Sequence, residues 1–98
     1  MVRRGRCRLR PIRVRTRDIV VHNGWDFILD AGPDGGTVRV PDCGGQADGH
    51  PRDPAQLAWA EAAFAALPGL VRVWPTVWEV SPASLSPLRA LLGAPSGG

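Results

Sequence analysis

Polar and apolar side chains alternate near the start of the chain as they do in β-strands. From residue 9 to 16 the side chains alternate, with Ile12, Val14 and Thr16 on one parity and Arg13, Arg15 and Arg17 on the other, which is the period of a half-buried strand. A β-branched run over residues 18–22 continues the strand, and Asn23-Gly24 is a two-residue turn signal before the apolar segment 25–29. We therefore expect a β-hairpin across Asn23-Gly24.

The next segments predict a third strand followed by a loop. A cluster of turn residues over 32–36 leads into residues 37–40, which read as a strand that ends at Pro41. The glycines in this cluster precede a strand and not a helix, so they are interpreted as a turn and not as a phosphate-binding loop. Residues 42–52 are rich in Gly, Asp and Pro and have no apolar periodicity, so we expect an exposed loop there.

The strongest helix signal follows this loop. Asp53 is a suitable N-cap, Pro54 suits the first helical position, and Gln56 is placed to return a hydrogen bond to the cap. Pro68-Gly69 ends the helix. Glu61 is the only charged residue within 55–67, so we expect this helix to make contacts beyond one sheet. The predicted core stripe consists of Leu57, Ala60, Phe64 and Leu67.

The last third predicts one more strand and a short helix. Residues 70–74 read as a strand that Pro75 breaks or bulges and that residues 76–80 resume, and the proline suggests an edge position. Candidate N-caps occupy residues 81–86, and Gly93 is placed to end the helix. The helical spacing is carried by Leu85, Leu88, Leu91 and Leu92.

Together these patterns predict an α+β fold. The expected element order is β-β-β-α-β-α, which is a mostly antiparallel small sheet with one main helix packed on a face and a short C-terminal helix. The 98 residues suit a single domain over 9–93, with an Arg-rich arm over 1–8 and a flexible tail over 94–98.

Composition bears on the cellular setting. No apolar run approaches the roughly 18 residues of a membrane span, and the basic N-terminus lacks the apolar core of a secretory signal. We therefore expect no membrane partner and a cytoplasmic location, or a virion if the chain derives from a phage. Cys7 and Cys43 then read as reduced thiols, and a bridge between them stays an open alternative.

The charge is divided between the two ends of the chain. Residues 1–17 carry eight arginines and no acid, hence +8, whereas residues 18–98 carry four arginines and nine acids, hence −5. Guanidinium groups bind phosphates and carboxylates, so this segment is the candidate polyanion-binding site, with nucleic acid and an acidic protein surface both open as partners. No aromatic residue lies within 1–24, which favours contact with a backbone over stacking on bases. The candidate residues are Arg3, Arg4, Arg6, Arg8, Arg10, Arg13, Arg15 and Arg17.

Catalytic and metal signatures are weak. Cys7, His22, Cys43 and His50 are the only soft metal ligands, and they lack the close pairs of structural zinc sites, so we expect no metal and no cofactor. The chain has no lysine, which excludes lysine-based chemistry. No nucleophile stands beside a recognisable base and orienting residue, so we assign no catalytic residues.

Three tryptophans are candidates for a partner interface. Trp is enriched where proteins dock, so Trp59, Trp74 and Trp78 are predicted interface residues, with burial in a core strand as the alternative for Trp74 and Trp78. The sequence thus favours a small non-enzymatic structural or interaction protein of a larger assembly, of the virion, tail or ribonucleoprotein type, with other protein subunits as partners. A free nucleic-acid-binding regulator is the alternative, and a small hydrolase or nuclease built on His22 and His50 is the third.

Overall fold

The fold consists of one antiparallel sheet, a separate hairpin and two helices. A computed structural model describes residues 15–93, apart from the side chains of residues 47 and 48. The strands are β1 (Thr16–His22), β2 (Trp25–Gly32), β3 (Gly35–Arg39), β4 (Asp42–Gly44), β5 (Ala47–Pro51), β6 (Leu70–Trp74) and β7 (Val77–Val80). The helices are α1 (Pro54–Ala65) and α2 (Leu85–Leu92), and a 3₁₀ turn (Pro82–Ser84) precedes α2.

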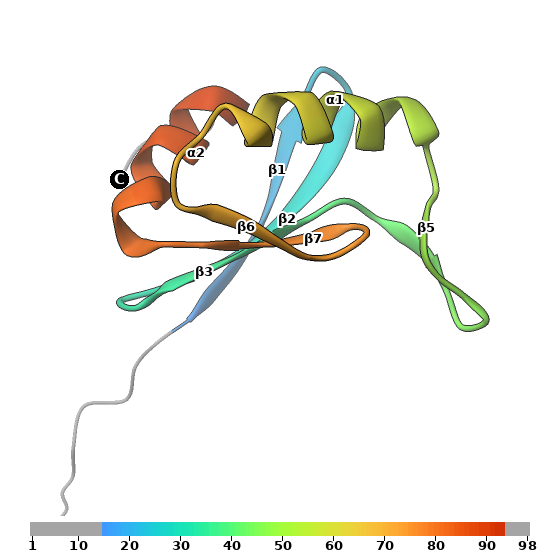
Figure 1. The fold of residues 1–98 in the computed structure, drawn as a ribbon, viewed down its shortest axis with the longest axis horizontal. Helices are drawn as coiled ribbons and strands as arrows, with labels where there is room; N and C mark the ends of the chain where they lie inside the picture. The colour runs from blue at the N-terminus through green and yellow to red at the C-terminus, as the bar shows by residue number, and fades with distance from the viewer. Residues whose placement is uncertain (1–14, 94–98) are drawn as a thin grey trace, which may run out of the picture.

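The main sheet has the strand order β1-β2-β3-β7-β6, and every neighbouring pair is antiparallel. Both helices lie on the same side of this sheet, while the β4–β5 hairpin extends beyond one end of it (Figure 1). The predicted α+β class, with a main helix on a face of a mostly antiparallel sheet and a short C-terminal helix, is confirmed.

The first hairpin forms as its turn chemistry predicts. Asn23 and Gly24 have φ of 54° and 80°, the left-handed conformations that a two-residue hairpin turn with the twist of the flanking strands requires. The turn sets the register that pairs His22 with Trp25 and Val20 with Phe27. The predicted first strand began at residue 9, and residues 9–14 lie outside the described part of the chain.

The expectation of an exposed loop over residues 42–52 is wrong. Residues 42 and 51, and 44 and 47, pair as the two-stranded β4–β5 hairpin, whose turn uses Gly44 and Gly45 at φ of 68° and 57°. A small hairpin that buries no face of its own needs no apolar periodicity, which is why the sequence pattern did not indicate it.

The expectation of a single interrupted strand over residues 70–80 is also wrong. Pro75 and Thr76 are the turn of a hairpin between β6 and β7, a position that suits the fixed φ of proline. Thr76 is 1% exposed, and its carbonyl oxygen accepts a hydrogen bond of 3.0 Å from the amide of Val40. The pairing of β6 with β7 contains a register shift between Arg72 and Trp74.

Helix α1 starts where the capping pattern predicts. The Asp53 carboxylate accepts a 3.0 Å hydrogen bond from the Ala55 amide and a 2.9 Å bond from Trp25 Nε1, so one side chain caps the helix and ties it to β2. Gln56 does not return to the cap as expected. Its Nε2 donates to the carbonyl oxygen of Asp26 at 2.7 Å, because the side chain is buried against the sheet.

The core lies between the sheet and the two helices. The predicted stripe residues Ala60 and Phe64 are buried, and Leu57 and Leu67 are half-buried against the same cluster. Gly93 ends α2 at φ of 75° as predicted. The buried cluster consists of Val20, Phe27, Leu29, Val38, Val40, Ala60, Phe64, Trp78, Val80, Leu88 and Leu92.

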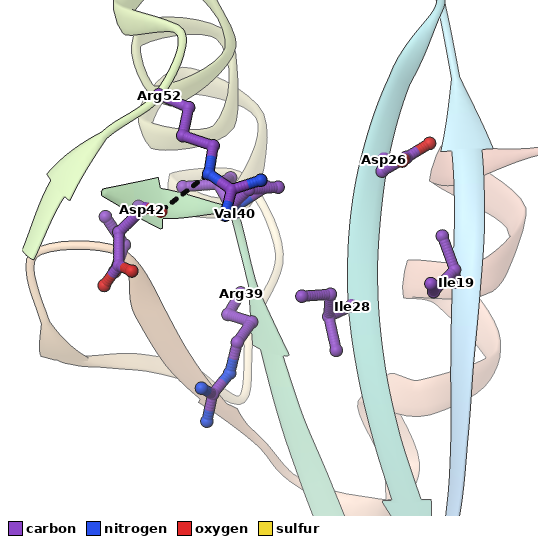
Figure 2. A pocket seen from close by; sticks show the side chains of 9 residues that line it. Ile19, Asp26, Ile28, Arg39, Val40, Asp42 and Arg52 are labelled. Carbon is purple, nitrogen blue, oxygen red and sulfur yellow. Dashed lines mark hydrogen bonds between the residues drawn. The ribbon is translucent and has the colours of Figure 1, made fainter. Parts of the chain in front are cut away.

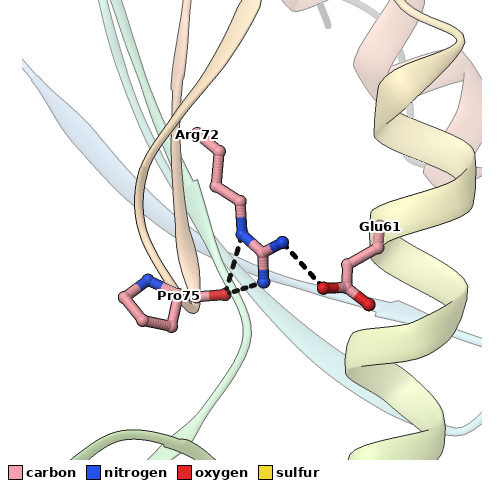
Figure 3. Close-up of polar contacts among 3 residues, drawn as sticks. All are labelled: Glu61, Arg72 and Pro75. Carbon is pink, nitrogen blue, oxygen red and sulfur yellow. Dashed lines mark hydrogen bonds and ion pairs between the residues drawn. The ribbon is translucent and has the colours of Figure 1, made fainter.

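Arg72 connects the β6–β7 hairpin to α1 on the helix-covered side (Figure 3). Its guanidinium donates to Glu61 Oε2 at 2.7 Å and to the Pro75 carbonyl oxygen at 2.6 Å, and it stacks 5.0 Å from the Trp78 ring centroid. The β6–β7 turn is therefore held against the helix layer.

Candidate functional site

One face of the sheet carries no helix. Side chains alternate along a strand, so Arg17, Ile19 and Val21 lie on the side opposite the core residue Val20. Directly paired residues share a face, and the register extends this side over all five strands. We call it the open face, and it comprises Arg17, Ile19, Val21, Asp26, Ile28, Asp30, Thr37, Arg39, Val71, Trp74, Val77 and Glu79.

A single row of paired residues crosses the open face from edge to edge. We call it the central row, and in strand order it consists of Ile19, Ile28, Arg39, Val77 and Trp74. Ile19 is 64% exposed and Trp74 is 48% exposed. Val21 and Val71 elsewhere on the same face are 62% and 60% exposed. The open face thus presents exposed apolar side chains at both edges of the sheet among charged residues, with the Arg39 guanidinium at the middle of the central row.

The Arg39 guanidinium is poorly satisfied. Within residues 15–93 its Nε nitrogen is buried and has no hydrogen-bond partner. A buried donor without an acceptor costs free energy, and a charged group costs more than a neutral one. The half-buried Arg39 therefore has one guanidinium nitrogen, Nε, that is buried without an acceptor among residues 15–93.

A pocket of about 300 Å³ separates the central row from the β4–β5 hairpin (Figure 2). We call it the Arg39 pocket; its lining includes Ile19, Ile28, Arg39, Pro41, Asp42 and Arg52. Arg52 Nε donates to the Asp42 carbonyl oxygen at 2.9 Å, and the Asp42 carboxylate accepts a 3.2 Å bond from the Gly49 amide. A second hollow of about 370 Å³ lies against Arg39, Asp42, Trp74 and Val77.

A salt bridge lies in the neighbouring row. Arg17 donates two hydrogen bonds, of 3.0 and 3.1 Å, to the two carboxylate oxygens of Asp30, its directly paired residue. Hydrogen bonding from Arg17 lowers the pKa of Asp30 below its usual value, and the positive charges of Arg39 and Arg15 act in the same direction. Asp30 therefore stays ionised beside the central row.

The predicted polyanion-binding arginines are only partly described. Six of the eight, Arg3, Arg4, Arg6, Arg8, Arg10 and Arg13, lie outside the described residues. Arg15 is exposed next to β1, and Arg17 is engaged by Asp30. Arg17, the last arginine of the basic segment, has the parity of Ile19 and Val21 and therefore lies on the open face.

The three tryptophans of the predicted interface lie in different surroundings. Trp78 is 5% exposed and packs its ring 5.0 Å from that of Phe64, so it belongs to the core. Trp59 is half-buried, and its ring stacks 4.6 Å from the ring of His22. Trp74 alone of the three is exposed. Trp74 and Trp78 share parity in the sequence, but the turn at Pro75 and the shifted register put them on opposite faces.

The residues considered for metal or catalytic roles are dispersed. His22 stacks on Trp59, while His50 is exposed on β5. Cys43 is exposed and free, and Cys7 lies outside the described residues. Within the part of the chain that the structure describes, no three His, Cys, Asp or Glu side chains gather where they could hold a metal ion.

Comparisons with known proteins give no assignment. No family model matches the chain, and neither the curated proteins nor the solved structures yield a match. Neither helix within residues 15–93 has the length and apolar character needed to cross a membrane.

The sequence analysis selected Arg17 and Trp74 of the open face, but not Arg39 or the aliphatic residues beside it. The alternation over residues 37–40 was visible and placed Arg39 on the polar side of a strand. Its apolar neighbours Ile28 and Val77 come from strands on either side, and the position of β7 beside β3 is set by the whole fold. The only local sign of the site was therefore a single arginine between two valines in a predicted strand.

Proposed function

We propose that this protein is a non-enzymatic interaction subunit of a larger protein assembly, which binds a protein partner through the open face of its sheet. The observation that carries the proposal is the apolar part of the open face. Ile19 and Trp74 are exposed at the two edges of the sheet, and the half-buried Ile28 and Val77 lie between them in the central row. Exposed apolar patches bordered by polar residues are typical of protein-binding surfaces. The Arg-rich N-terminal segment would extend the same contact.

The charges of the open face indicate the chemistry of the partner. Arg17 is neutralised by Asp30, whereas Arg15 is exposed and the Arg39 Nε has no hydrogen-bond partner within residues 15–93. A partner surface that presents carboxylates among apolar side chains would complement this arrangement. The acidic remainder of a second copy and an acidic region of another subunit both meet this description.

A protein suits the open face better than a nucleic acid. Proteins that bind nucleic acids through a sheet stack bases on several aromatic side chains. On the open face Trp74 is the one exposed aromatic side chain, while Ile19, Val21 and Val71 are aliphatic. Aliphatic side chains pack against other apolar side chains and offer no ring for stacking.

Site-specific photo-crosslinking in the cells from which the chain comes tests this function. A benzophenone amino acid replaces Ile19 or Val71 on the open face and, as the matched control, Ala62 on the exposed side of α1. We expect a discrete protein adduct from both open-face positions and none from Ala62. An adduct of twice the chain mass would identify a second copy, and any other discrete mass a different subunit.

Two results would overturn the proposal. The first is the lack of any adduct from Ile19 and Val71, or equal adducts from the Ala62 control. The second is an adduct that nuclease digestion removes, combined with oligonucleotide binding that weakens steeply as salt rises. That second result would establish the nucleic-acid-binding regulator instead.

A further inference from the structure

The Arg39 pocket combines two kinds of surface in a small volume. Ile19 and Ile28 form an aliphatic wall from β1 and β2, and Arg39 and Arg52 supply guanidinium groups from β3 and from the segment after β5. Figure 2 shows the Ile28 side chain directed toward Arg39, and the Arg52 guanidinium hydrogen-bonded to the Asp42 backbone. The pocket therefore offers positive charge for an anionic group and an aliphatic surface for an apolar group next to it.

The two carboxylates at the pocket do not satisfy Arg39. The Asp42 carboxylate is turned to the β4–β5 hairpin, where it accepts a hydrogen bond from the Gly49 amide. The Asp26 side chain points away from Arg39 (Figure 2), and its carbonyl oxygen accepts a bond from Gln56. Within residues 15–93 the Arg39 Nε therefore has no acceptor, although an aspartate stands on either side of the pocket.

We infer that the Arg39 pocket binds a carboxylate group that neighbours an aliphatic side chain on the partner protein. The Arg39 guanidinium donates to the carboxylate in the forked geometry that guanidinium and carboxylate share. Arg52 adds a second positive charge, and the aliphatic group packs on Ile19 and Ile28. This inference rests on the proposed function, because it names the chemistry by which the partner is recognised.

A carboxylate of this kind belongs either to a chain terminus or to an acidic side chain. Small-molecule probes distinguish these two sources. N-acetyl-leucine presents a terminal carboxylate beside an aliphatic side chain. N-acetyl-leucyl-glutamic acid diamide presents a side-chain carboxylate with the terminus blocked. N-acetyl-leucinamide keeps the aliphatic group and has no carboxylate. Because ligands of this size bind weakly, dissociation constants of about 1–10 mM are expected for an accepted probe.

The experiment is a titration of the isotopically labelled full chain followed by NMR. At least one carboxylate probe should shift the Arg39 Nε–H signal and the amides of Ile19 and Ile28, and the leucinamide should leave them unchanged. Arg39→Gln should weaken binding of that probe about tenfold or more, since it removes a charged, bidentate donor. Arg89→Gln is the matched control, because Arg89 lies on α2 beside Asp18 and loses the same charge away from the pocket.

Each outcome of the titration supports or overturns carboxylate binding in the Arg39 pocket. No shift with either carboxylate probe, equal binding of the leucinamide, or undiminished binding by Arg39→Gln would overturn the inference. Crosslinking from Ile19 and Val71 can still succeed in that case, and the proposed function then stands without a carboxylate contact at Arg39. Probe binding without crosslinks would retain the pocket and overturn the proposed partner.

Discussion

At the scale of single residues, Arg39 stands out because its position is costly for the isolated domain. A buried guanidinium nitrogen without an acceptor lowers the free energy of unfolding, and an apolar side chain of similar length would not incur this penalty. Residues that serve binding commonly reduce the stability of the free protein. Variants of Arg39 therefore allow the proposed carboxylate binding to be compared with the free energy of unfolding of the isolated protein.

We predict that Arg39→Met stabilises the isolated protein. The substitution removes the unsatisfied donor and adds apolar contact with Ile28 and Val77, so the free energy of unfolding should rise by about 0.5–1 kcal/mol. Urea denaturation measures the change. Arg72→Met is the comparison, because Arg72 is satisfied by Glu61 and Pro75, and it should lower stability by about 0.5–1.5 kcal/mol. A loss of stability in Arg39→Met would contradict this interpretation.

The Arg17–Asp30 pair predicts a stability change at low pH. The folded-state pKa of Asp30 lies below its value in the unfolded chain, so the pair stabilises the fold above about pH 4, and this contribution is lost as the pH falls through the lowered pKa. Arg17→Gln should raise the pKa of Asp30, as read from its carboxyl ¹³C shift. The urea midpoints of Arg17→Gln and the wild type should differ at about pH 6 and converge near pH 2.

The Asp30 prediction has an internal control. Arg89→Gln removes a guanidinium from α2, which covers the opposite face of the sheet, so it should leave the carboxyl titration of Asp30 unchanged. An Asp30 pKa that is the same in Arg17→Gln and the wild type would show that the pair does not hold that carboxylate ionised.

At the scale of elements, Asp53 couples helix α1 to the first hairpin. One carboxylate oxygen caps the helix at the Ala55 amide, and the other accepts from Trp25 on β2. Gln56 reinforces the link from the first turn of the helix through its bond to the Asp26 carbonyl oxygen. The entry of α1 is thereby fixed against β2, so the hairpin and the helix should lose structure together.

We predict that Asp53→Ala lowers the free energy of unfolding by about 1–2 kcal/mol, because it removes the cap and leaves the Trp25 indole N–H without its acceptor. Asp53→Asn retains one carbonyl oxygen and should fall between the wild type and Asp53→Ala. Thermal denaturation ranks the three proteins. Identical midpoints for Asp53→Ala and the wild type would show that the cap does not couple the two elements.

At the scale of the whole molecule, the sequence predicted those features that local chemistry decides. The turn at Asn23-Gly24, the helix start at Asp53 and the helix end at Gly93 each depend on residues next to one another, and each is confirmed. Pro75 is compatible with a strand edge and with a turn, and only the pairing of β6 with β7 distinguishes them. The β4–β5 hairpin lacked a buried face and hence a periodic pattern.

The candidate site was harder to predict than the fold because it is assembled from distant segments. Arg39 lies between apolar residues only because strand pairing places Ile28 and Val77 beside it. Trp74 joins the same row because the β6–β7 turn pairs it with Val77. Local parity placed Trp74 and Trp78 together, whereas the turn separates an exposed tryptophan from a core one. Strand order, which no local pattern encodes, decides which residues meet on the open face.

The pairing of β3 with β7 also bears on how the protein folds. Among the described strands, every other pair joins consecutive strands, whereas β3–β7 joins segments on either side of the β4–β5 hairpin and α1. Closing so long a loop costs chain entropy before its contacts form, so we expect it to dominate the folding barrier. Arg39 meets Val77 in this pairing, so the central row of the open face is completed only when the two halves of the chain join. A nascent chain released before β7 emerges would therefore lack both Val77 of the central row and the core residues Trp78 and Val80.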